Sequence, residues 1–80
     1  MNVQILLFGI AKDILKTASL DVSFYENTTV AVLKNQLVSM YPELKNISTY
    51  AIAINESYAD DEDIVNENDV IALIPPVSGG

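Results

Sequence analysis

The C-terminal residues are the part of this sequence whose types and spacing could do chemistry. The 80-residue chain ends in Pro75-Pro76-Val77-Ser78-Gly79-Gly80, and two of its three glycines are the last two residues. Consecutive prolines keep a chain extended. Residues without a Cβ can enter a narrow tunnel and adopt dihedral angles that other residues avoid. We therefore expect a folded domain over residues 1–75, followed by a flexible tail over 76–80.

The carboxylate of Gly80 is the reactive group that such a tail would carry. A carboxylate reacts once one of its oxygens becomes a leaving group. Adenylation by ATP achieves this, and a sulfur nucleophile can then displace AMP. The product is a thiocarboxylate on Gly80, a nucleophile at the end of a flexible arm. The alternative interpretation is a frayed terminus without function.

Composition excludes most other chemistry. The chain has no Cys, His, Arg or Trp, which excludes disulfides, thiolate metal sites and the Ser-His-Asp and Cys-His arrangements of nucleophilic catalysis. Partner proteins must therefore supply the acid, base and oxyanion hole, and we expect no metal and no bound cofactor. The net charge is −7, with four Lys against eleven Asp and Glu, which argues against nucleic acids and membranes as partners.

Acidic residues are concentrated in one segment. All the acids that follow residue 46 lie between Glu56 and Asp69, a part of the chain without lysine. The segment is either a solvated loop that aids solubility or a surface that attracts a basic partner. A calcium loop that starts at Asp61 would need Gly at its sixth position and Glu at its twelfth, where Asn66 and Ala72 stand instead.

The expected location is the cytoplasm. No apolar run reaches the length of about 18 residues that crosses a bilayer. The first residues, Met-Asn-Val-Gln-Ile, lack the charged region and the cleavage site of a signal peptide.

Apolar runs predict the strands that must position the tail. They cover residues 3–8, 20–25, 50–55 and 70–74, and a further short strand is expected near Tyr58. The first and last runs are apolar on both faces, which is typical of strands at the centre of a sheet.

Two other segments have apolar residues at helical spacing. The shorter helix, over 10–18, is expected to direct the side chains of Ile10, Ile14 and Ala18 towards the protein interior. The longer helix, over 30–41, is expected to bury Val30, Leu33, Leu37 and Met40. Thr29 is the predicted N-cap of the longer helix, and Pro42 ends it.

This order of elements predicts an α+β fold of the ubiquitin-like β-grasp type. One main helix packs on one face of a mixed sheet of four to five strands. The opposite face would present Leu6, Phe8 and Ile74 beside the alanines of neighbouring strands. An apolar face with an aromatic residue suggests a protein interface, unless loops cover it.

Over its full length the sequence resembles the small subunits of molybdopterin synthase, the MoaD-like sulfur carriers. The resemblance is carried by residues 7–15, 29–30, 41–44, 53–56 and 68–80. The last block, which ends in Ile-Pro-Pro-Val-Ser-Gly-Gly, is the most specific. Lys12 stands where many relatives have Arg.

The resemblance implies several steps and partners. An adenylating enzyme of the ubiquitin-activating type would adenylate Gly80 with ATP, and a sulfur donor protein would convert it to the thiocarboxylate. Two small subunits would dock on a dimer of the large subunit, giving a heterotetramer in which Gly80 is the small subunit's own catalytic group. Each tail would thread into a large-subunit active site and pass sulfur to cyclic pyranopterin monophosphate. The residues that thread would be Pro75, Pro76, Val77, Ser78 and Gly79. Phe8 and Ile74 would belong to the face that meets both partners.

Three other functions fit parts of the sequence. The chain could be a thiamine-type or other β-grasp sulfur carrier, a ubiquitin-like modifier joined to lysines through Gly80, or a binding module with an inert tail. The thiamine carriers are shorter and usually lack the helix predicted at 10–18. The Pro-Pro-Val-Ser-Gly-Gly ending also favours the molybdopterin branch.

Overall fold

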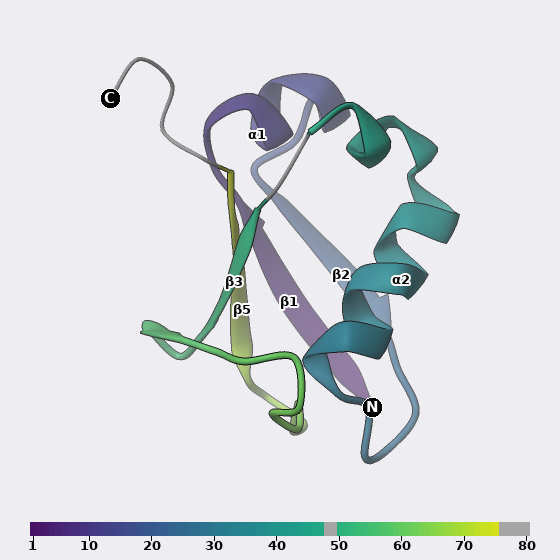
Figure 1. The fold of residues 1–80 in the computed structure, drawn as a ribbon, viewed down its shortest axis with the longest axis vertical. Coiled ribbons are helices and arrows are strands. Elements are labelled where there is room, and N and C mark those ends of the chain that lie inside the picture. Colours follow the sequence, from purple (N-terminus) through teal and green to yellow (C-terminus); the bar gives the residue numbers. More distant parts are fainter. Residues whose placement is uncertain (48–49, 76–80) are drawn as a thin grey trace.

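A computed structural model describes residues 1–47 and 50–75 of the chain. Its elements are β1 (Asn2–Leu7), α1 (Gly9–Leu15), β2 (Ser19–Ser23), α2 (Val30–Met40), the short 3-10 helix η1 (Pro42–Asn46), β3 (Ala51–Ile54), β4 (Ser57–Tyr58) and β5 (Val70–Ile74). The strands form one mixed sheet in the order β2-β1-β5-β3-β4, and β1 and β5 are its parallel pair. α2 covers one face of this sheet (Figure 1). The predicted β-grasp fold is confirmed, with the first and last strands side by side.

The core lies between the sheet and α2. Alternate residues of β1 point into it, and β5, β2 and α2 supply the facing side chains. The buried residues of these four elements are Val3, Ile5, Leu7, Ile71, Leu73, Val22, Val30, Leu33 and Leu37. Burying one aliphatic side chain of this size stabilises a fold by about 1.5–3 kcal/mol, so this layer holds the sheet and helix together.

The sequence predicts both ends of α2. The Thr29 hydroxyl accepts a hydrogen bond from the Val32 amide at 3.3 Å, as expected of an N-cap. The helix ends at Met40, and Pro42 opens η1, which the sequence did not predict. The prediction for Met40 is wrong, because its side chain is exposed in the last turn of the helix.

The acidic segment packs against the start of α2. The first N–H groups of a helix have no partner within the helix. Here the Val30 amide donates to the Asp63 carbonyl at 2.9 Å, and the Ala31 amide donates to the Asp61 carbonyl at 3.1 Å. The Lys34 ammonium pairs with the Asp61 carboxylate at 3.1 Å. The loop therefore completes the hydrogen bonding of the helix through its backbone.

The prediction for the shorter helix is partly wrong. α1 ends at Leu15, and Lys16 follows in a left-handed conformation with φ of 59°. The cause is the sheet, because the Leu7 amide donates to the Ala18 carbonyl at 2.8 Å and draws residue 18 towards β1. Ala11 is fully buried, whereas Ile10 is 51% exposed. In the described ranges, no helix is long and apolar enough to cross a membrane.

Candidate functional site

The sheet face opposite α2 carries a row of apolar side chains. Leu6 of β1 pairs with Ala72 of β5, which pairs with Ala53 of β3. Tyr58 of β4 pairs with Ala53 and is 75% exposed. Side chains of paired residues share one face of a sheet, so these four form one row. Because the side chains of the two alanines are small, the surface of the sheet is recessed between Leu6 and Tyr58.

A second apolar row lies next to the first, at the α1 end of the sheet. Ile74 pairs with Ala51. The register of β1 and β5 ends at Leu7 with Leu73, and one further residue along each strand brings Phe8 beside Ile74. Phe8 is extended, with φ of −125° and ψ of 159°, and its carbonyl accepts a hydrogen bond from the Ala11 amide at 3.1 Å. Phe8 therefore stays on this face although α1 begins directly after it.

The structure thus brings the predicted interface residues Leu6, Phe8 and Ile74 together. We call Leu6, Phe8, Ile74, Ala72 and Tyr58 the open apolar face. Phe8 is 48% exposed, so within the described residues no loop covers it. The role of the open apolar face as a protein interface is a prediction, and the exposure of its side chains on one side of the sheet is consistent with it.

The described part of β5 leads into the predicted tail beside this face. Pro75 is buried, and a Cβ built on Gly9 would lie 3.4 Å from the Pro75 Cγ. Gly9 has φ of +53°, a conformation that residues with side chains rarely adopt. The junction of β1 and α1 therefore packs on Pro75, next to Phe8. The other predicted tail residues, Pro76, Val77, Ser78, Gly79 and Gly80, lie outside the described residues.

A partly buried phenol, that of Tyr50, lies on the side of the sheet away from the open apolar face. Burial raises the pKa of the Tyr50 phenol above its ordinary value of 10.0. Its ring packs against the core, with the Lys34 ammonium of α2 5.9 Å from the ring centroid, so it is on the α2 side of the sheet. Within residues 1–47 and 50–75, no three acidic side chains gather to hold a metal ion. The open apolar face is suited to docking a protein.

Comparison with known proteins decides the family. The ThiS family matches residues 5–80, which includes the tail. This chain belongs to the ThiS family. One relative, the molybdopterin synthase sulfur carrier subunit of Dictyostelium discoideum, is 37% identical over 82 residues, which cover 96% of this chain and 94% of that protein. The resemblance expected from the sequence is confirmed.

Two solved structures extend the comparison of this ThiS family member. SAMP1 from Haloferax volcanii matches over 100% of both chains with a TM-score of 0.87, which shows a common fold. The two sequences are 22% identical. A chain in the complex of subunits 1 and 2 of the molybdopterin-converting factor from Helicobacter pylori 26695 is 29% identical, with a TM-score of 0.72 and 100% of both chains covered.

Sequence reasoning missed one residue of the open apolar face. Tyr58 was expected in a short strand, but its place opposite Ala53 depends on the two-residue turn between β3 and β4. The signal that could have found it is the turn at Asn55 and Glu56, because a hairpin loop of fixed length sets the register of its strands.

Proposed function

We propose that this chain is the sulfur-carrying small subunit of a molybdopterin synthase. The observation that carries the proposal is the match of 37% identity with a molybdopterin synthase sulfur carrier subunit along nearly the full length of both proteins. The open apolar face supports it, because it gives a large partner subunit a surface beside the start of the tail. The Helicobacter pylori complex of subunits 1 and 2 supports a large subunit as that partner.

The proposed chemistry takes place on Gly80. A carboxylate oxygen of Gly80 attacks the α-phosphorus of ATP in a ubiquitin-activating-type enzyme, and pyrophosphate leaves. A sulfide from a sulfur donor protein then attacks the carbonyl carbon, AMP leaves, and a thiocarboxylate remains. The chain itself provides the carbonyl and the arm, and the partner provides the groups that stabilise the charge.

Delivery of the sulfur takes place in the large subunit. Leu6, Phe8 and Ile74 dock on that subunit, and residues 76–79 lead from the buried Pro75 into its active site. The thiocarboxylate sulfur displaces an oxygen from a carbon of cyclic pyranopterin monophosphate, which leaves a thioester between Gly80 and the pterin. Water then hydrolyses this thioester, so the sulfur stays on the pterin and Gly80 returns to a carboxylate. Docking holds the Gly80 thiocarboxylate next to the bound precursor, which raises the effective concentration of the two reacting groups.

The test uses the purified full chain and its partners. The chain is incubated with the adenylating enzyme, ATP and a sulfur source, and its intact mass is measured. We expect a gain equal to the exchange of one oxygen for sulfur, and then loss of that gain with formation of molybdopterin when the large subunit and precursor are added. A variant without Gly80 is the control; it should unfold at nearly the same temperature as the parent but gain no sulfur.

Other outcomes would overturn the proposal. No change in mass would indicate a binding module with an inert tail. Loading with sulfur that passes to a thiazole precursor, and not to the pterin, would indicate a thiamine-type carrier. Adducts of high mass on lysines would indicate a protein modifier.

A further inference from the structure

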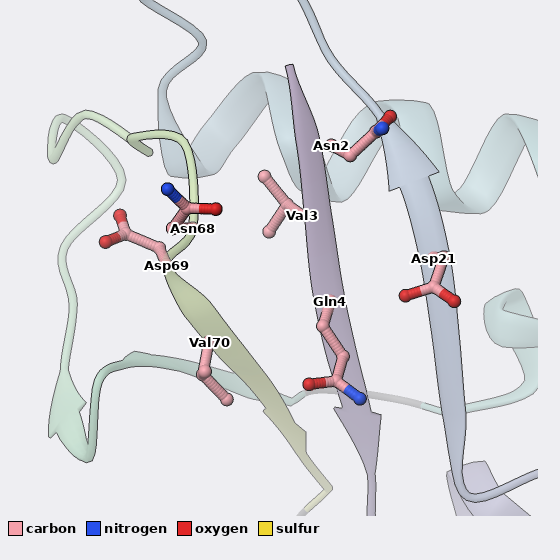
Figure 2. Close-up of a pocket in the computed structure, with 7 residues that line it drawn as sticks. All are labelled: Asn2, Val3, Gln4, Asp21, Asn68, Asp69 and Val70. Carbon is pink, nitrogen blue, oxygen red and sulfur yellow. The ribbon is translucent and has the colours of Figure 1, made fainter.

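The sheet face that carries the open apolar face has a polar end. Asp21, Gln4 and Val70 pair across β2, β1 and β5. They line a hollow of about 260 Å³, together with residues of the β1 start and the turn before β5 (Figure 2). Gln4 and Leu6 point to the same side of β1, about 7 Å apart along the strand. The hollow is therefore continuous with the open apolar face.

Asp21 is the one charged side chain in the five strands. It is exposed at the centre of β2, and in residues 1–47 and 50–75 its carboxylate makes no hydrogen bond or ion pair. The four lysines lie outside the strands, and Lys34 is already paired with Asp61. The N-terminal ammonium of Met1 donates to the Phe24 carbonyl at 2.9 Å. Within the described residues, no cation is therefore paired with the Asp21 carboxylate.

Asp69, the second acid of the hollow, is already used within the fold. One of its carboxylate oxygens accepts a hydrogen bond from the Asn55 side-chain amide at 2.9 Å, and the other accepts one from the Asn66 backbone amide at 2.8 Å. Asp69 is thus fixed in the turn before β5. The carboxylate left to a partner is that of Asp21.

A protein that covers the open apolar face would take water away from Asp21. An enclosed carboxylate without a partner is strongly destabilising, and a cation with good hydrogen bonds offsets this cost. We propose that the protein that docks on Leu6, Phe8 and Ile74 inserts a lysine or arginine side chain into this hollow. Its cationic group pairs with the Asp21 carboxylate and donates to the side-chain oxygen of Gln4.

This inference rests on the proposed function, which names the docking protein as the large subunit. It gives that subunit a second, electrostatic requirement beside its apolar one. The requirement also sets the direction of docking, since the cation must lie at the Asp21 end of the sheet and the active-site entrance at the Pro75 end. Such pairs add specificity as well as affinity.

The test compares two variants that lose the same charge. Asp21→Asn removes the carboxylate from the hollow, and Asp60→Asn removes one from the acidic loop, where the Asp60 backbone makes the contacts. Binding of each full-length chain to the large subunit is measured by calorimetry at low and at moderate salt. We expect Asp21→Asn to weaken binding about 10-fold or more and to reduce its salt dependence, with Asp60→Asn within about twofold of the parent.

Backbone amide spectra give a second measurement. On addition of the large subunit, the amide signals of Gln4 and Asp21 should change together with those of Leu6 and Ala72. A change that stops at Leu6 and Ala72 would overturn the inference.

The outcomes separate the inference from the proposed function. If the parent chain binds the large subunit and Asp21→Asn binds it with a Kd within about twofold of the parent's, the inference is overturned and the proposed function stands. An equal loss in both variants also overturns it, because the attraction would then come from overall charge. A parent chain that does not bind the large subunit overturns the proposed function and, with it, the inference.

Discussion

Truncation of Phe8 tests whether the open apolar face is the docking surface. Phe8 is 48% exposed. A phenylalanine side chain presents about 200 Å², so a partner that covers the ring would bury about 100 Å² more. At about 25 cal/mol per Å² this area contributes about 2.5 kcal/mol of binding free energy. Phe8→Ala should therefore raise the Kd for the large subunit about 60-fold.

The assay is calorimetric binding of the full chain to the large subunit, at a temperature where thermal unfolding shows both variants folded. The backbone carbonyl of Phe8 that begins α1 is kept in the variant. Val32→Ala is the matched control, because Val32 is 50% exposed but lies on α2, on the covered side of the sheet. Its Kd should stay within about twofold of the parent.

Two results would refute this reasoning. If Phe8→Ala binds as tightly as the parent, the ring is not covered by the partner. If Val32→Ala weakens binding as much as Phe8→Ala, the loss does not come from the open apolar face.

Two further predictions concern stability. Glu56 has φ of 73° in the turn between β3 and β4, where a side chain is strained and glycine is favoured. Glu56→Gly should raise the free energy of unfolding by up to about 1 kcal/mol, and Tm by about 4–8 °C per kcal/mol; a fall in Tm would contradict the strain. The pKa of Tyr50 is raised by burial, so its neutral form stabilises the fold below about pH 10, and this contribution is lost as the pH rises through the folded-state pKa. In Tyr50→Phe the alkaline fall in Tm should be shallower than in the parent, and an identical slope between the two would rule out a role for this phenol.

Local patterns in the sequence were enough to locate most elements. The start of α2 follows from a hydroxyl at Thr29, and its end follows from a proline at position 42. The strands follow from alternation, which also places Leu6 and Phe8 on the face opposite the core. Each of these signals is contained in a few consecutive residues, so it can be seen without the fold.

Predictions failed where a distant segment decides the local conformation. The helix predicted over 10–18 ends early because β1 pairs with residues 18–23. The acidic segment looked like a free loop, but its carbonyls complete the first turn of α2. Each of these contacts joins two segments that are distant in the sequence, so neither can be predicted from the residues of one segment alone.

The sequence by itself determined which chemistry is excluded, since the chain has no Cys and no His, and it predicted a folded domain followed by a short tail. Only the tertiary structure decided which residues surround Pro75, where the predicted tail begins. The open apolar face and the hollow at Asp21 join residues of β2, β1, β5 and β4 that lie far apart in the sequence. The reason is physical, because periodicity sets which side of a strand each residue occupies, whereas strand order and register set which residues meet.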